Sequence, residues 1–519
     1  MLRQRHHGMS FSGMPPMVEE RRPRREEFSE PCTVTDRTFF PHTCRTSPRC
    51  SPLRHPSLTE GHFRVGDVAE ACVPMTGRRR IRSTFLPRHH RPVRATALAA
   101  GALAACASLV AGCGVVPGTA GGSGDDPIKV MTWAPSDTKA TNKPGMPAFA
   151  RAYARWINSR GGIHGRKLTV LTCNDHNDGV SAAKCARRAV KENVVAVVGS
   201  YSQYGDSFFP PLEGAGIPYI GGYGITNDEF TSPLSYPVNG GQPTLLAGLG
   251  KELAAACGNV TLVRPDTIAG DELPVLLNSG LTTGKHRPAS DVRAADDATE
   301  YSAQSTKALG SSTSSAAAAG SKEGCVVPAL GDRTSTFMDS FRRVREDYPS
   351  VRTAMAMGSV DQTEIDASGG ASGPYEGSYI TGWYPVESDA RWDAMKKVIN
   401  AEAFGDNRID SADAGVQTTW IAYTVFEKAV ESLGGGEVSA DSLRGALNGG
   451  LKISTGGLTP TLQWTTRDTW SSADDLAVVG FPRMVNAHVT FQVVRRGQLV
   501  AARKGFTDVT RTLQNADVN

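Results

Sequence analysis

The sequence of 519 residues lacks the short motifs by which several classes of enzyme are recognised. The first expected strand is followed by Ala-Pro-Ser-Asp-Thr-Lys-Ala-Thr at residues 134–141. This stretch lacks the G-x-G-x-x-G turn that a dinucleotide site needs. The sequence also has no G-x-S-x-G elbow, no H-E-x-x-H and no catalytic Cys/His pairing. We therefore expect neither an enzyme nor a bound cofactor or metal.

Lysine is missing from the first 112 residues, which hold 18 arginines and 9 acidic residues. The rest of the chain holds 38 basic and 43 acidic residues, a net charge of −5. The sequence pI of about 8.5 therefore reflects the arginine-rich start, and we expect no nucleic-acid partner. Residues 1–90 show no sustained apolar period. We interpret them as disordered or as a mis-assigned upstream segment, with Met75 a natural start; a basic functional tail is the alternative.

The uncharged apolar run 95–110 is too short for a comfortable membrane span and has the length of the apolar core of an export signal. Arginines precede it, and it ends in Leu-Val-Ala-Gly-Cys at residues 109–113. This order resembles a bacterial lipobox, in which the signal peptide is cut before a cysteine that carries lipid. We therefore expect residues 91–112 to be a signal peptide and Cys113 to be lipidated. A chance cysteine in an alanine-rich segment is the alternative.

A flexible tether is expected over residues 113–125, since glycine and serine dominate there without apolar period. Lipid on Cys113 would anchor the protein without spanning the membrane. The expected location is therefore extracytoplasmic, at the outer face of the bacterial cell membrane, with the membrane as a partner through the lipid anchor.

No pair of the ten cysteines has Cys-x-x-Cys spacing, which makes a zinc site the weaker interpretation. Beyond Cys113 the chain holds Cys173, Cys185, Cys257 and Cys325. An even number in an exported protein favours two disulfides, for which three pairings exist. Proximity in sequence favours Cys173–Cys185 and hence Cys257–Cys325.

Alternating strand and helix patterns run from residue 128 to residue 220. Strands are expected at residues 128–133, 167–173, 193–199 and 217–220, because each is short, apolar and rich in β-branched residues. A helix with one apolar face is expected over residues 146–157. Asn177 or Asp178 is expected to cap the next helix. Its inward face is expected to comprise Val180, Ala183, Ala186 and Val190. This β-α order predicts an α/β fold with a parallel, doubly wound sheet.

The stretch 156–168, Trp-Ile-Asn-Ser-Arg-Gly-Gly-Ile-His-Gly-Arg-Lys-Leu, resembles type 1 periplasmic binding proteins together with Asn174-Asp175 and residues 194–200. The branched-chain amino-acid-binding group that serves ABC transporters is the most similar. The resemblance covers about residues 126–508. It implies two Rossmann-like lobes with parallel sheets joined by three crossovers. Residues 126–240 plus 386–480 would form lobe 1, residues 241–385 plus 481–508 lobe 2, and residues 509–519 a tail.

The resemblance also implies a ligand cleft between the lobes, lined by loops at the carboxyl ends of strands. In the first lobe these loops hold Ser200, Tyr201, Ser202, Gly222 and Tyr223, and Trp133 would face the cleft edge. Serine hydroxyls and helix-start N–H groups suit a carboxylate. In the second lobe, Asp332 or Asp361 would pair with a ligand ammonium. Ordinary capping and solvation are the alternatives for these residues.

The cleft loops of the second lobe, Thr267-Ile268-Ala269 and Gly331-Asp332, lack the aromatic residues of the branched-chain group. This difference disfavours leucine, isoleucine or valine as the ligand. We expect a monomeric, lipid-anchored solute-binding protein that delivers an amino acid or similar small polar solute to an ABC permease. The alternative is a ligand-sensing module of the same fold without transport.

Overall fold

The computed structural model of the protein describes residues 126–139, 141–267, 269–295, 297–313, 322–347, 350–465 and 480–514. The upstream segment, the expected signal peptide, Cys113 and the tether lie outside the described residues. No helix among the described residues is both long enough and apolar enough to cross a membrane.

The first lobe contains a five-stranded parallel sheet with the strand order β2-β1-β3-β4-β5. Neighbouring residues of one strand face opposite sides: Val130 packs in one apolar cluster and Met131 in another. Both faces are therefore covered, which explains the nearly continuous apolar composition of the strands. The strands are β1 (Ile128–Trp133), β2 (Leu168–Cys173), β3 (Ala196–Val198), β4 (Tyr219–Ile220) and β5 (Ser235–Tyr236).

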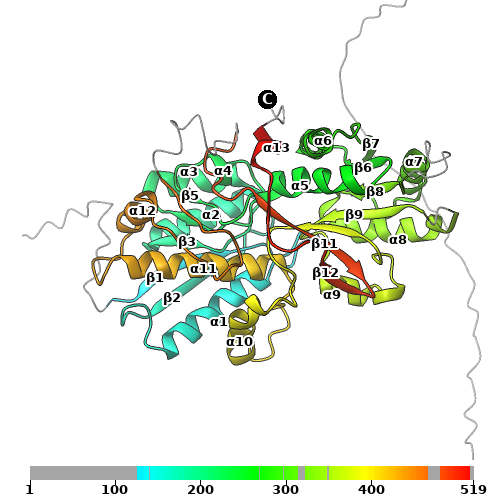
Figure 1. The fold of residues 1–519 in the computed structure, drawn as a ribbon. Coiled ribbons are helices and arrows are strands. Elements are labelled where there is room, and N and C mark those ends of the chain that lie inside the picture. The colour runs from blue at the N-terminus through cyan, green and yellow to red at the C-terminus, as the bar shows by residue number, and fades with distance from the viewer. Residues whose placement is uncertain are drawn as a thin grey trace, which may run out of the picture. The chain divides into compact units, whose positions relative to one another are not determined.

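Helices from two separate parts of the chain cover this sheet (Figure 1). They are α1 (Gly145–Ser159), α2 (Gly179–Lys191), α3 (Gly205–Ala215), α4 (Asp228–Thr231), α10 (Asp393–Glu402), α11 (Ala414–Ser432) and α12 (Ala440–Asn448), with the 3-10 turn η5 (Ala390–Trp392). Helix α11 packs against α1 and against β3 and β4, so the chain returns to the first lobe after it has built the second.

The second lobe contains an eight-stranded sheet in which β12-β11-β10-β9-β8-β6-β7 are neighbours and β13 pairs with β11. The strands are β6 (Val260–Pro265), β7 (Ser290–Ala294), β8 (Cys325–Pro328), β9 (Arg352–Ala356), β10 (Tyr379–Gly382), β11 (His488–Arg495), β12 (Gln498–Ala501) and β13 (Thr507–Asp508). The helices and 3-10 turns are α5 (Gly241–Ala256), α6 (Leu273–Thr283), α7 (Ser302–Thr313), α8 (Thr334–Val344), α9 (Gln362–Ala367), α13 (Thr510–Gln514), η1 (Ala269–Glu272), η2 (Gly331–Arg333), η3 (Arg345–Asp347) and η4 (Gly370–Ser372).

The expected α/β fold class with parallel sheets is confirmed, and the second sheet adds an antiparallel edge. Strands β6 to β10 are parallel, whereas β11 runs antiparallel to β10 and β12. Only Arg496 and Gly497 join β11 to β12, and both have positive φ. A two-residue turn of this kind can join only antiparallel strands. The residue bounds of the two lobes stay a prediction.

The expected cap of α2 is confirmed, and its expected inward face is correct at Ala186 and Val190 but wrong at Val180. The carboxylate of Asp178 accepts a hydrogen bond from the N–H of Ser181 at 2.9 Å. Val180 is 62% exposed. The fully buried residues are Ala182, Cys185, Ala186 and Ala189, and the partly buried Val190 packs against the same cluster. Cys185, which is bonded to Cys173, lies on this buried face.

The structure contains both expected disulfides. Cys173 at the end of β2 is bonded to Cys185 in α2, and Cys257 after α5 is bonded to Cys325 at the start of β8. The Cα–Cα distance is 5.8 Å in each bond, within the range that disulfides require. Each bond joins a strand to a helix that covers its sheet.

Candidate functional site

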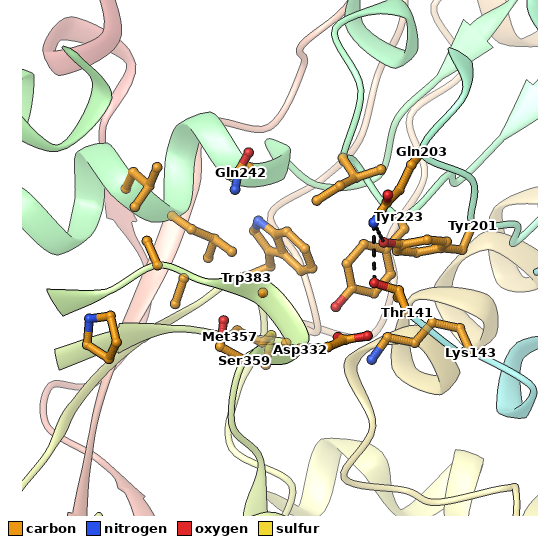
Figure 2. Close-up of a pocket in the computed structure, with 18 of the residues that line it drawn as sticks. Thr141, Lys143, Tyr201, Gln203, Tyr223, Gln242, Asp332, Met357, Ser359 and Trp383 are labelled. Carbon is orange, nitrogen blue, oxygen red and sulfur yellow. Dashed lines mark hydrogen bonds between the residues drawn. The ribbon is translucent and has the colours of Figure 1, made fainter. Parts of the chain in front are cut away.

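A cavity of about 120 Å³ lies between loops of the first lobe and loops of the second (Figure 2). The first lobe contributes loops at the carboxyl ends of β1, β3 and β4, and the second contributes loops after β8, β9 and β10 together with the start of α5. Ligands of open α/β sheets bind at such strand ends. The lining residues are Thr141, Lys143, Tyr201, Gln203, Tyr223, Ile225, Gln242, Leu245, Leu246, Val327, Pro328, Ala329, Gly331, Asp332, Ala356, Met357, Gly358, Ser359 and Trp383.

Three aromatic rings form one wall of this cavity. The ring of Tyr223 lies edge-on to that of Tyr201 at a centroid distance of 5.0 Å and to that of Trp383 at 5.3 Å. The indole N–H of Trp383 donates to the carbonyl of Gly241 at 3.0 Å. Because this polar atom already has a partner, Trp383 offers the cavity an apolar face.

The two tyrosines are neutral hydrogen-bonding groups. Burial raises the pKa of Tyr201 to about 12, against the opposing effect of its hydrogen bond with Gln203. Burial also raises the pKa of Tyr223. The amide of Gln203 donates to the Tyr201 hydroxyl at 3.0 Å and to the Thr141 hydroxyl at 3.2 Å. This network fixes Tyr201 against the cavity.

Lys143 contributes a positive charge at one end of the cavity. Its Nζ forms an ion pair with Asp413 at 3.2 Å and lies 5.7 Å from the centre of the Tyr223 ring. Burial acts to lower the pKa of Lys143, but the negative charges of Asp413 and Asp332 oppose it, and the pKa lies well above its usual value. The side chain is therefore an ammonium at neutral pH.

Asp332 is exposed and lies at the same end of the cavity as Lys143 (Figure 2). Both residues also line a second, more open cavity of about 400 Å³. Gly358 and Ser359 belong to both cavities as well. The two cavities therefore meet at this charged end, and the inner one continues from there toward its apolar lining.

The structure brings together Tyr201, Tyr223 and Asp332 of the eight residues predicted to bind ligand. Asp361 lies in the second cavity instead. Its carboxylate caps α9 by accepting the N–H of Glu364 at 3.0 Å, and burial raises its pKa.

The expectation that Trp133 faces the cleft is wrong. Its side chain is fully buried in the first lobe, where the ring packs against Phe208 at 5.4 Å and Tyr219 at 5.9 Å. Strand β1 is covered on both faces, so the last residue of the strand packs under α3 instead of pointing to the cavity.

Ser200, Ser202 and Gly222 do not line the cavity either. The Ser200 hydroxyl accepts the N–H of Trp133 at 3.1 Å, and both serines are buried. The Ser202 hydroxyl accepts the N–H of Tyr204 at 3.3 Å and hydrogen-bonds Asp175. These hydroxyls hold the loop after β3 in place, and Tyr201 and Gln203 are the residues of this loop that line the cavity.

Sequence reasoning missed Lys143, Gln203 and Trp383. Lys143 stands in a loop of proline, serine, threonine and lysine, where a lysine has no distinctive pattern. Its proximity to the first strand was the one available signal, because the end of that strand opens onto the cleft. Its partner Asp413 is 270 residues away, and no local pattern joins the two. No cluster of potential metal ligands occurs among the described residues.

A family model described as periplasmic binding protein matches residues 136–473. The chain belongs to the periplasmic binding protein family. The match confirms the resemblance expected from the sequence and the expectation of a binding protein instead of an enzyme. Among curated proteins, none matches the chain by sequence.

Solved structures of periplasmic binding proteins share this fold at low sequence identity. A substrate-binding periplasmic protein from Ralstonia solanacearum is 15% identical, with a TM-score of 0.56 over 72% of this chain and 99% of that chain. A leucine-binding protein from Thermotoga maritima is 12% identical, with a TM-score of 0.55 over 73% and 99%. An ABC-transporter solute-binding protein from R. palustris, in complex with benzoate, is 16% identical, with a TM-score of 0.55 over 73% and 96%.

Proposed function

We propose that this periplasmic binding protein delivers an amino acid or a similar small polar solute to an ABC permease. The observation that carries the proposal is the cavity between the two lobes, where Lys143 and Asp332 bring opposite charges to one end of an aromatic and aliphatic lining. Structures of the same fold bind leucine and benzoate, both small solutes with a carboxylate. The permease would recognise the protein, as a monomer, with its two lobes closed on the solute.

We also propose that the protein acts outside the cytoplasm as a lipoprotein. The support is the order of arginines, the apolar run 95–110 and Cys113 in the sequence. A tether over residues 113–125 would hold the binding lobes close to the membrane surface that contains the permease.

Thermal unfolding of the purified full-length protein tests solute binding. The solute panel contains amino acids, carboxylates, amines and sugars, each at millimolar concentration. A ligand present at 100 times its Kd stabilises the folded state by about 2.7 kcal/mol, so at least one solute is expected to raise the Tm by several degrees. The proposal fails if no solute in the panel raises the Tm and mass spectrometry finds no small molecule released from denatured protein.

A further inference from the structure

We propose that one edge of the first lobe binds the anionic headgroups of the membrane to which the protein is tethered. This basic edge consists of the exposed residues Lys129, Arg160, Lys167, Arg187 and Lys191. The inference rests on the lipid anchor of the proposed function and goes beyond it, because it states how the anchored lobes are oriented. It does not depend on which solute the cavity binds.

Hydrogen bonds place the end of α1 beside the starts of β1 and β2. Asn158 lies in the last turn of α1. Its side-chain amide donates to the carbonyl of Leu168 at 2.9 Å and accepts the N–H of Leu168 at 2.8 Å. The N–H of Ile128, the first residue of β1, donates to the carbonyl of Lys167 at 2.8 Å. Arg160, Lys167 and Lys129 therefore lie at one edge of the sheet.

The end of α2 reaches the same edge. Lys191 is the last residue of α2, and Arg187 lies one turn before it. Four residues after Lys191, the N–H of Val195 donates to the carbonyl of Lys129 at 2.9 Å. The starts of parallel strands share one edge of a sheet, and the cavity is lined by loops at the opposite edge. A membrane at the basic edge would therefore leave the cavity loops facing away from it, toward the solute.

The charge at this edge is opposite in sign to that of the body as a whole. Segments 126–129, 160–167 and 187–193 hold seven basic and two acidic residues, whereas the chain beyond residue 112 has a net charge of −5. None of the five cations of the basic edge forms an ion pair with an acidic residue of the described chain. Each such cation strengthens binding to an anionic membrane by about fivefold when it lies near the surface.

Arg160 adds an aromatic ring to the basic edge. Its guanidinium lies over the ring of Trp156, 4.8 Å from the ring centre, and Trp156 is half-buried. Tryptophan and arginine both suit the boundary between lipid headgroups and water, because each combines apolar surface with a polar group. The edge therefore offers the membrane surface an aromatic side chain as well as positive charge.

The expected tether joins the first lobe at this edge. Asp126 is the first described residue, and its carbonyl accepts the Nε–H of Arg166 at 2.8 Å, directly beside Lys167 in sequence. Asp126 comes 13 residues after Cys113. A glycine-rich chain of that length spans about 20 Å on average and at most about 45 Å. The membrane that holds the proposed anchor is therefore within reach of the basic edge.

Lysine labelling of the anchored protein tests the contact. The protein is purified from membranes of an expressing bacterium and inserted from outside into vesicles of phosphatidylcholine, with or without phosphatidylglycerol. Mass spectrometry measures acetylation of each lysine by a membrane-impermeant reagent. In the anionic vesicles at low salt, Lys129, Lys167 and Lys191 are expected to react at least threefold more slowly than in the neutral vesicles. The exposed Lys307 and Lys504 of the second lobe are expected to react equally in both. High salt is expected to remove the protection, because it screens exposed charges.

Charge-reversal variants separate the basic edge from the total charge of the protein. The protection of Lys129 is expected to disappear in the triple variant Lys167→Glu, Arg187→Glu and Lys191→Glu. It is expected to persist in a matched control that reverses three exposed cations of the second lobe, Lys307→Glu, Arg342→Glu and Lys504→Glu. It is also expected to persist in Lys167→Arg combined with Lys191→Arg, which keeps the charge. Circular dichroism verifies folding of each variant.

The outcomes separate this inference from the proposed function. Equal labelling of Lys129, Lys167 and Lys191 in the two kinds of vesicle overturns the membrane contact, while the anchor and solute binding stand. Protection in native membranes, labelled in parallel, but in neither kind of vesicle points to a protein partner at this edge and likewise overturns the membrane contact. Failure of the wild-type protein to insert into vesicles overturns the lipid anchor, and the inference falls with it.

Discussion

Gly358 is a residue at which the two sides of the candidate site approach each other closely. Its φ is +90°, and a Cβ placed there would lie 2.3 Å from the Tyr223 hydroxyl oxygen of the first lobe. An alanine would therefore strain the backbone and also push against Tyr223. Glycine at this position allows the loop after β9 to lie against the aromatic wall.

We predict that Gly358→Ala weakens ligand binding at least tenfold, because the methyl group displaces Tyr223 from the cavity. Gly369→Ala is the matched control, since Gly369 has a φ of +107° and the nearest atoms to its Cβ position lie at 3.6 Å. The backbone strain is expected to cost each variant about 1–3 kcal/mol of unfolding free energy. Calorimetric titration measures affinity, and urea unfolding measures stability. Equal losses of affinity in the two variants would show that strain, and not the contact with Tyr223, is responsible.

Individual residues also show which parts of the site could not be predicted from the sequence. Tyr201 and Tyr223 were predictable because they follow strand ends of a recognisable parallel sheet. Ser200 and Ser202 follow the same strand, yet their hydroxyls bond inside the lobe. Whether a hydroxyl faces a ligand or its own loop depends on the backbone path of the loop, which a strand pattern does not specify.

At the scale of elements, the two disulfides close chain loops of different length. The bond Cys173–Cys185 joins residues 12 apart, whereas Cys257–Cys325 joins residues 68 apart and spans β6 and β7. A longer loop loses more conformational entropy in the unfolded chain when it is closed. The second bond therefore restricts the unfolded state more than the first.

We predict that replacing Cys257 and Cys325 together by alanine lowers the unfolding free energy by about 1.5 kcal/mol more than replacing Cys173 and Cys185, from the dependence of loop entropy on length. Urea unfolding of the two double variants beside the wild type measures this difference. A larger loss for the Cys173/Cys185 variant would instead indicate that packing of the bond between β2 and α2 dominates.

The positions of the helices follow local sequence patterns more closely than the burial of their side chains does. Periodicity identified α1, and Asp178 marked the start of α2. The expected inward face of α2 was correct at Ala186 and Val190 but wrong at Val180, which is exposed. Packing beside Cys185 favoured small side chains instead, which let the helix lie close to the sheet.

At the scale of the whole molecule, the proposed function depends on where the binding lobes are held. The proposed lipid on Cys113 would keep them at the membrane. We predict that wild-type protein expressed in a bacterium sediments with the membrane fraction and that Cys113→Ser shifts most of it to the soluble fraction. Ligand binding is expected to stay unchanged, since the described lobes begin at residue 126. Equal sedimentation of both proteins would contradict the anchor.

By itself, the sequence determined the repeated β-α pattern, the covered parallel strands, the family and the pairing of Cys173 with Cys185, because these depend on residues close together along the chain. The pairing of Cys257 with Cys325, 68 residues apart, followed only because these two cysteines remained. The tertiary structure alone decided which polar groups remain for a ligand. It joined Lys143 to Asp413 across 270 residues and placed Asp332 at the same end of the cavity. It also enclosed Trp133 and two serines within the first lobe. A polar group is free for a ligand only when no other part of the folded chain takes its hydrogen bonds, and that condition involves residues from both lobes.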